Sequence, residues 1–297
     1  MYSLEVNDIV MKYGNFTALH DVSVKVKKGE FLTLLGPSGC GKTTLLKIIS
    51  GFIEPSNGKI FINKKDVTKT PPETRDTAMC FQSYALFPHL TVLQNLSFGL
   101  IQRKVDSKKR GQILDEVVSQ LELTTELEKL PNQLSGGQQQ RVALGRALVM
   151  RPEVILFDEP LSNLDALLRE SVRMEIKRIV KIFNLTAIYV THDQHEALSL
   201  SDRIALMNEG KIIQIDNSET IYNNPKNSFV ANFLGSSNIL KASFIKKGNK
   251  KNEFIFKSKI GELLVFSEKS SFKPEVQISW RSEKVVFNKS VDNKFKG

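Results

Sequence analysis

The chain has 297 residues, more than one hydrophobic core usually supports, so we expect one large domain and one small appended domain. With 41% hydrophobic and 25% charged residues, the composition excludes the class of disordered chains. The net charge is +10, but residues 238–297 hold 14 Lys and Arg against 6 Asp and Glu, so most of the excess lies in the tail. A basic tail of this kind is typical of a solvated surface, and we expect no nucleic-acid partner.

Membrane spans and disulfides are not expected either. No apolar run approaches the roughly 18 residues that cross a bilayer, and residues 1–10 lack the basic start and apolar stretch of a signal peptide. The two cysteines, Cys40 and Cys80, are too few for a disulfide scaffold in a chain of this size and fit a reducing cytosol. Any membrane role would therefore depend on a partner.

Apolar runs and periodicities predict an α/β fold. Strands are expected at 4–10, 31–35, 154–157 and 187–190, and helices at 42–50, 111–121, 138–149 and 166–183. Alternation of the two favours a mainly parallel sheet. Residues 88–150 interrupt this alternation and are expected to form a helical subdomain. After Gly235 come short alternating pieces separated by polar residues and Gly, so the predicted domains are 1–235 and a short β domain at 236–297.

Segment 36–43, GPSGCGKT, matches GxxxxGK[ST] between a predicted buried strand and a predicted helix, which is the context of a P-loop. Its glycines let backbone N–H groups point at one phosphate, and the helix N-terminus adds a positive field. Lys42 is expected to reach the β and γ phosphates and the Thr43 hydroxyl to ligate Mg²⁺. A glycine-rich turn without a ligand is the alternative. The predicted nucleotide-binding residues here are Gly36, Pro37, Ser38, Gly39, Cys40, Gly41, Lys42, Thr43 and Thr44.

A second anion-binding pattern lies at residues 134–138, LSGGQ, directly before a predicted helix. Backbone amides and a helix N-terminus again face an anion, so Ser135, Gly136, Gly137 and Gln138 are predicted to contact nucleotide. A simple Ser N-cap followed by flexible glycines is the alternative.

Carboxylates follow the buried strand at 154–157. Ligands of parallel sheets bind at the carboxyl ends of the strands, so both side chains are expected beside the P-loop. Asp158 is placed to hold Mg²⁺, and Glu159 to orient or deprotonate an attacking water. Without a P-loop, the pair would be read as a surface turn.

These motifs together resemble the ATP-binding subunits of ABC transporters, closely over residues 1 to about 235 and more loosely in the tail. The resemblance implies a P-loop NTPase domain that binds ATP and Mg²⁺ and hydrolyses ATP. In that family the signature segment of one subunit caps the γ-phosphate held by the P-loop of another. The chain carries one of each motif, so a head-to-tail dimer with a second copy is expected.

The resemblance assigns further positions one by one. Tyr13 would stack on adenine, and Gln82 would sense Mg²⁺ and water and couple to the transmembrane partner. Asp165 lies in the loop that crosses the dimer interface. His192 would contact the γ-phosphate and hold the water with Glu159, so the expected catalytic set is Glu159, His192 and Gln82. The expected metal set is Thr43, Gln82 and Asp158.

Two positions depart from the commonest family pattern. Asn163 stands where many relatives have Ala, and sugar-importer ATPases often share this Asn. His195 stands where relatives usually have Glu. We treat His195 as a surface variation.

The sequences of residues 71–100 and 191–235 are similar to those of the importer branch of the family. It implies two transmembrane permease subunits, a separate solute-binding protein and a peripheral position at the cytoplasmic face of the inner membrane. Ferric iron is the solute expected from the short tail and from GSSNIL, with polyamine or sugar as the alternative. The rival functions are a non-transport ABC ATPase acting on ribosomes or DNA, and a regulatory module with the same fold. The absence of a second fused nucleotide domain argues against the first, and an intact Glu159 and His192 against the second.

Overall fold

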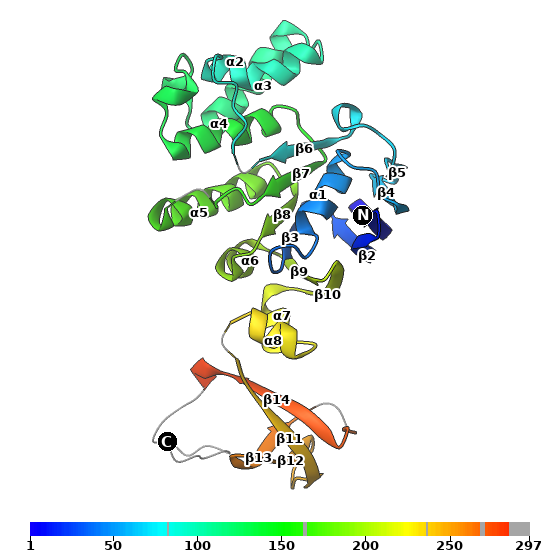
Figure 1. The fold of residues 1–297 in the computed structure, drawn as a ribbon. Coiled ribbons are helices and arrows are strands. Elements are labelled where there is room, and N and C mark those ends of the chain that lie inside the picture. Colours follow the sequence, from blue (N-terminus) through cyan, green and yellow to red (C-terminus); the bar gives the residue numbers. More distant parts are fainter. Residues whose placement is uncertain (82, 163–164, 236, 268–270, 285–297) are drawn as a thin grey trace. The chain divides into compact units, whose positions relative to one another are not determined.

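The computed structural model describes residues 1–297 except 82, 163–164, 236, 268–270 and 285–297. The chain separates into two compact units, residues 1–221 and 222–297 (Figure 1). In the described residues, no helix has the length and apolar character needed to span a membrane.

A six-stranded sheet forms the centre of the first unit, in the order β10-β9-β3-β8-β7-β6. In that order its strands are Lys211–Asp216, Arg203–Asn208, Phe31–Leu35, Thr186–Thr191, Val154–Asp158 and Thr77–Cys80. All neighbours pair parallel except β10, which runs antiparallel to β9. The α/β class is therefore confirmed. Because β3, β8 and β7 are adjacent, the loops after them meet at one edge of the sheet.

A second, antiparallel sheet of order β2-β1-β4-β5 was not anticipated from the sequence. Its strands are Phe16–Lys27, Tyr2–Tyr13, Asn57–Ile62 and Lys65–Asp66. Helix α1, Lys42–Ser50, shares one hydrophobic core with both sheets: Leu45 and Ile48 of the helix cluster with Val6 of β1 and Leu34 of β3. The P-loop helix is thus held between two sheets.

Three helices gather at one end of the first unit, as Figure 1 shows: α2 Val92–Gln102, α3 Ser107–Gln120 and α4 Gly136–Leu148. They fall within the range 88–150, and short 3₁₀ turns at 124–126 and 131–133 join α3 to α4. Leu96, Val117 and Val142, one from each helix, pack in the core that also contains Phe157 of β7. Helices α5, Ala166–Ile182, and α6, Gln194–Leu200, follow β7 and β8.

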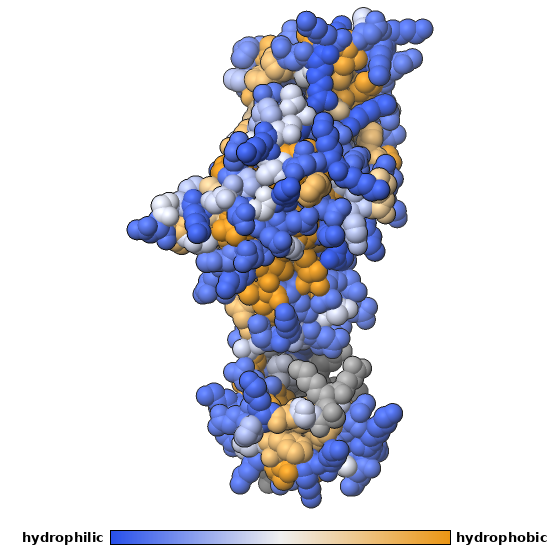
Figure 2. Space-filling model, turned by 90° about the vertical axis from the view of Figure 1, so that its right-hand side faces the viewer, coloured by the Kyte–Doolittle hydropathy of each residue, from blue (hydrophilic) through white to orange (hydrophobic). Residues whose placement is uncertain are grey.

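The surface is mainly hydrophilic with separate apolar patches, as the face in Figure 2 shows. Large apolar side chains that are more than a third exposed include Phe16, Phe52, Phe81 and Phe98.

The second unit contains a four-stranded antiparallel sheet of order β13-β12-β11-β14, with strands Gly261–Phe266, Glu253–Ser258, Ser237–Lys247 and Glu275–Arg281. The helix α7, Ser218–Asn223, spans the division between the units, and α8 is Ser228–Phe233. Arg281 of β14 donates to the carbonyl oxygens of Tyr222, Ala231 and Leu234 at 2.6 to 2.9 Å. These bonds tie α8 to the β sheet, so the units divide after Ile221 and not after Gly235 as the sequence suggested.

Candidate functional site: a phosphate loop with two carboxylates and a histidine

The loop between β3 and α1 is packed too tightly for side chains at two of its glycines, Gly36 and Gly41. A Cβ on Gly36 would lie 2.3 Å from the carbonyl oxygen of Met207, and one on Gly41 would lie 2.7 Å from Leu19 Cδ2. Gly41 also has a φ of 100° and is the N-cap of α1, which has no side-chain cap. The first-turn N–H groups of α1 are therefore available to an anion.

Lys42 is buried, with 5% of its surface exposed. Its Nζ donates to the carbonyl oxygens of Gly36 at 2.8 Å and Pro37 at 3.0 Å, and it lies 3.9 Å from Cys40 Sγ. Lysine is rarely buried without a counter-charge, and these partners carry none. A phosphate in the loop would supply that charge.

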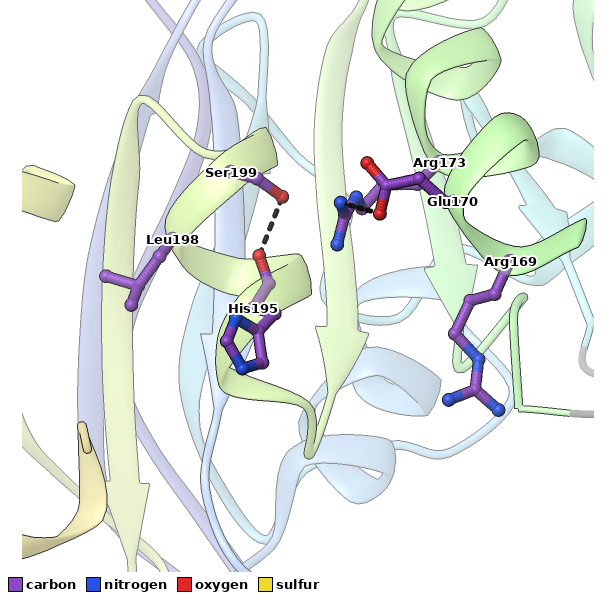
Figure 3. Close-up of a pocket in the computed structure, with 6 residues that line it drawn as sticks. All are labelled: Arg169, Glu170, Arg173, His195, Leu198 and Ser199. Atoms are coloured by element: carbon purple, nitrogen blue, oxygen red, sulfur yellow. Dashed lines mark hydrogen bonds and ion pairs between the residues drawn. The ribbon is translucent and has the colours of Figure 1, made fainter. Parts of the chain in front are cut away.

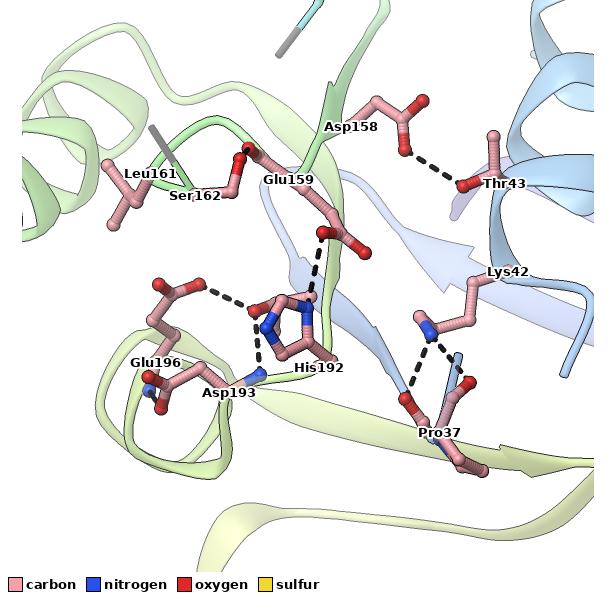
Figure 4. A network of polar contacts seen from close by, with 12 residues as sticks. Pro37, Lys42, Thr43, Asp158, Glu159, Leu161, Ser162, His192, Asp193 and Glu196 are labelled. Atoms are coloured by element: carbon pink, nitrogen blue, oxygen red, sulfur yellow. Dashed lines mark hydrogen bonds and ion pairs between the residues drawn. The ribbon is translucent and has the colours of Figure 1, made fainter. Parts of the chain in front are cut away.

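Thr43 and Asp158 come together across the sheet edge, as Figure 4 shows: Thr43 Oγ1 donates to Asp158 Oδ1 at 3.1 Å. Burial raises the pKa of Asp158, and the nearby Glu159 raises it further, while the Thr43 hydrogen bond and the Lys47 and Lys42 charges oppose this. A hydroxyl and a carboxylate are the hard oxygen ligands that Mg²⁺ prefers, and the bonded partner of Asp158 among the described residues is the neutral Thr43 hydroxyl. This donor set fits Mg²⁺.

Glu159 stands in a strained turn directly after β7. Its φ is 45°, in the left-handed region that non-glycine residues seldom occupy. The surroundings hold it there: Glu159 N donates to Val190 O at 3.1 Å, and Ser162 Oγ donates to Glu159 O at 2.8 Å. The turn directs the carboxylate toward the loop after β8, where Glu159 Oε2 lies 3.2 Å from His192 Nδ1 (Figure 4).

The predicted catalytic pair is therefore brought into contact, while the third member, Gln82, lies outside the described residues, as does Asn163. A crevice of about 60 Å³ surrounds the pair. Its lining comes from the ends of β7 and β8 and the starts of α5 and α6: Glu159, Ser162, Arg169, Thr191, His192, Asp193 and Glu196.

The signature segment caps its own helix. Ser135 is the N-cap of α4 in a reciprocal capping box: Gln138 N donates to Ser135 Oγ, and Ser135 N donates to Gln138 Oε1 at 2.9 Å. Gln138 Nε2 also donates to Glu126 Oε1 at 3.2 Å. The Gln138 side chain, predicted to bind nucleotide, is thus engaged in fixing this turn. Ser135 is exposed, and Gly136 and Gly137 are half-buried.

The other predicted positions are accessible in varying degree. Tyr13, at the end of β1, is 48% exposed, which leaves an aromatic face available for stacking. Asp165 is exposed directly before α5. In the P-loop, Ser38 and Gly39 are exposed, Pro37 and Thr44 are half-buried, and Cys40 is buried.

Sequence reasoning missed two supports of this site. Met207 and Gly210, at the β9–β10 turn, contact the P-loop, and Gly210 N donates to Cys40 O at 3.1 Å. Glu196 is buried beside the His192 turn. Its place four residues after His192, in the first turn of the next helix, was a usable signal.

A larger pocket of about 480 Å³ lies between α5 and α6 (Figure 3). It is lined by Arg169, Glu170, Arg173, His195, Leu198 and Ser199. His195 faces this pocket and not the crevice beside His192. Glu170 is paired with Arg173, and the Ser199 hydroxyl donates to His195 O at 2.6 Å.

Comparison with known proteins agrees with this geometry. The sequence profile of the family described as "ABC transporter" matches residues 19–162. A part of an ABC transporter complex from Clostridium perfringens superimposes with a TM-score of 0.69 at 28% identity, covering 74% of this chain and 90% of that one. A dimeric ATP-binding cassette solved with ADP and Pi gives a TM-score of 0.61 at 31% identity, covering 72% and 98%.

Curated relatives are import ATP-binding proteins. The spermidine/putrescine protein PotA of Chromobacterium violaceum is 49% identical over 243 residues, covering 82% of this chain and 67% of the relative. PotA of Bacteroides thetaiotaomicron is 50% identical, covering 82% and 52%. The trehalose/maltose protein MalK of Thermococcus litoralis is 50% identical, covering 80% and 65%. The chain thus spans between about half and two thirds of these relatives.

Proposed function

The chain belongs to the family of ABC transporter ATP-binding proteins, and on this premise we propose that it hydrolyses ATP to energise solute import. The observation that carries the proposal is the buried Lys42 ammonium, whose bonded partners are uncharged, at the same sheet edge as the Glu159–His192 pair. A triphosphate would neutralise the ammonium and present its terminal phosphate to the pair.

In the proposed reaction, water attacks the γ-phosphorus and ADP leaves. Phosphoryl transfer needs positioning and charge stabilisation more than covalent chemistry. Lys42 and the α1 N-terminus would stabilise the phosphate charge, and Tyr13 would stack on the adenine. The Glu159 carboxylate would orient the water or accept its proton. With the proton on Nδ1, His192 donates to that carboxylate and fixes its direction.

Mg²⁺ would be held by Thr43 Oγ1 and Asp158, and when bound it neutralises phosphate charge. Gln82 remains a proposed third contributor. The described residues contain no cluster of three His, Cys, Asp or Glu that could bind a metal without the nucleotide.

Two copies are proposed to act as a pair. Ser135 and Gln138 bond to each other, and the Gln138 side chain also donates to Glu126 of the same region. The glycine turn is then available to cap a nucleotide on the second copy, head to tail, with Asp165 at the same interface. A relative with 31% identity was solved as a dimer with ADP and Pi, which supports this arrangement.

The partner surface is proposed at a pocket of about 230 Å³ lined in part by Phe81, Tyr84 and Phe98. Phe81 and Phe98 are 37% and 38% exposed there, and the buried Tyr84 hydroxyl has no described hydrogen-bond partner. Apolar rings with one unsatisfied hydroxyl suit a helix of a permease. We propose that the chain lies at the cytoplasmic face of the inner membrane, on two permease subunits served by a separate solute-binding protein, as in the importer branch of the family. Phe98→Asp should abolish copurification with the permease while Ile182→Asp, also at an exposed apolar position, should not.

A polyamine is the solute class that we favour. The ferric-iron preference drawn from the sequence is not supported, because the relatives with the matches above are named for spermidine/putrescine or trehalose/maltose import. Sugar is the second candidate, on the strength of the MalK relative at 50% identity.

Uptake in cells that lack this chain tests both the solute class and the role of ATP hydrolysis at this site. Radiolabelled spermidine, maltose and ferric iron are measured in parallel, before and after complementation. We expect spermidine uptake to return with the wild type and with Glu128→Gln, an exposed position, and not with Glu159→Gln. Recovery of maltose uptake alone would overturn the polyamine assignment. Full uptake with Glu159→Gln would overturn ATP hydrolysis at this site.

A further inference from the structure

The turn that contains His192 is stabilised by hydrogen bonds of the Thr191 hydroxyl. Thr191 Oγ1 donates to Glu196 Oε2 at 2.7 Å and accepts from Asp193 N at 3.0 Å. A hydroxyl has one proton, so donation to the carboxylate leaves its lone pairs for the Asp193 N–H. The hydroxyl thus links both residues that flank His192 to a single acceptor on α6.

That acceptor is a buried carboxylate. Glu196 is 4% exposed, and its Oε2 also accepts from the Tyr189 hydroxyl at 2.9 Å. Its own N–H donates to Asp193 Oδ1 at 3.2 Å, which closes the turn from the other side. Burial raises the pKa of Glu196, and the Thr191 and Tyr189 hydrogen bonds oppose that rise. Two hydroxyl donors on one oxygen compensate part of the cost of burying it.

The His192 ring has little support of its own. Its side chain is 57% exposed, and its described polar contact is the 3.2 Å approach to Glu159. The position of an exposed side chain depends on the backbone that carries it. Since that backbone is fixed at 191 and 193, the hydrogen bonds to Glu196 decide where the imidazole meets Glu159.

We infer that Glu196 is a positioning residue for ATP hydrolysis: through Thr191 it holds the His192 imidazole against the Glu159 carboxylate. The expected effect on kcat rests on the proposed function, ATP hydrolysis. The expected effect on the position of the His192 ring does not depend on it.

The chain provides matched variants. Thr191→Val keeps the shape of the side chain and removes both hydrogen bonds that the Thr191 hydroxyl makes in the turn. Tyr189→Phe removes one hydrogen bond to the same Glu196 oxygen and leaves the turn intact. Glu196→Gln retains an oxygen that can accept from both hydroxyls, whereas Glu196→Ala retains none.

The kinetic test measures ATP hydrolysis by the full chain assembled with its permease in vesicles. Misplacement of a catalytic group by about 1 Å can cost about 100-fold, so kcat should fall by about that factor in Glu196→Ala and in Thr191→Val. In the double variant kcat should fall no further, because both substitutions break the same hydrogen bond between Thr191 and Glu196. KM for ATP should change less than about twofold, since the P-loop grips the nucleotide. Glu196→Gln and Tyr189→Phe should keep most of kcat.

The geometric test uses the ring NMR signals of the isolated full chain with labelled histidine. The chain has four histidines, and His192→Gln identifies the relevant signal. Glu196→Ala and Thr191→Val should shift the His192 signal, while Tyr189→Phe should not. If wild-type protein fails to hydrolyse ATP, the proposed function fails and this signal alone decides the inference. An unmoved His192 signal in Glu196→Ala, or an equal loss of kcat in Tyr189→Phe, overturns it.

Discussion

Arg75 provides the sharpest stability prediction. Arg75 is 1% exposed, and the described partners of its guanidinium are carbonyl oxygens, with no carboxylate among them. Nη1 donates to Ile48 O at 2.8 Å and Ile49 O at 2.9 Å, two carbonyls in the last turn of the P-loop helix α1. Nε and Nη2 donate to the carbonyls of Thr70 and Thr68. A cation at a helix C-terminus also complements the helix dipole.

The Arg75→Met substitution keeps much of the apolar stem and removes all of these donors. Each buried carbonyl left without a donor costs about 1 to 3 kcal/mol, and relief of the buried cation offsets part of that cost. We therefore expect the free energy of unfolding to fall by about 3 kcal/mol. The last turn of α1 should also fray, and because α1 begins at Lys42, the affinity for ATP should fall as well.

Urea denaturation followed by far-UV circular dichroism measures the first effect. Arg151→Met is the matched control, because Arg151 is 61% exposed and pairs with Glu116 at the surface, where such pairs contribute about 1 kcal/mol or less. A loss below about 1 kcal/mol in Arg75→Met, or an equal loss in both variants, would refute the idea that Arg75 holds the end of the P-loop helix.

The remaining predictions concern the site itself. Glu159→Gln should bind ATP normally and accumulate as a closed dimer in gel filtration with ATP and Mg²⁺; rapid turnover would remove Glu159 from its role. Lys42→Ala should lose nucleotide affinity in a fluorescent-ATP titration, and unchanged affinity would contradict the phosphate-loop assignment. Burial raises the pKa of Glu196, so the folded chain holds this proton more tightly than the unfolded chain and the carboxyl stabilises the fold most at low pH. Relative to Glu196→Gln, the wild type should lose stability as pH rises above about 4.3. If the wild type instead gained stability relative to this variant, burial would not be the dominant influence on the pKa of Glu196. Burial raises the pKa of Cys80 to about 12, so alkylation at pH 8 should be slower in the native chain than in urea by about a thousandfold, and equal rates would show that the thiol is exposed.

Much of the site could be predicted from the sequence, because its residues lie in short contiguous segments or at the ends of neighbouring strands. The strand 31–35 and the helix 42–50 have the bounds that were predicted, since a continuous apolar run and a glycine loop leave little choice of conformation. Asp158, Glu159 and His192 end or follow neighbouring strands, and parallel strands bring such residues to one edge.

Other features depend on contacts that no local pattern reports. Arg281 bonds to carbonyls about fifty residues earlier in the chain, and this moves the division between the units to residue 221. The antiparallel sheet was missed because only one of its strands was recognised, and β2 pairs with it along a long hairpin. The left-handed φ of Glu159 has no sequence signal, since glycine or asparagine would be the usual choice there.

Two ionisable groups in the binding half of the site have neutral hydrogen-bond partners among the described residues. Lys42 is a buried cation bonded to neutral carbonyls, and Asp158 is a carboxyl whose pKa is raised by burial and bonded to a neutral hydroxyl. Phosphate would neutralise the first group, and Mg²⁺ would favour the ionised form of the second. The Glu159–His192 contact, by contrast, is made between two side chains of the chain itself. We therefore expect phosphate and Mg²⁺ to complete the binding half of the site, whereas the turns after β7 and β8 set the geometry of the catalytic pair.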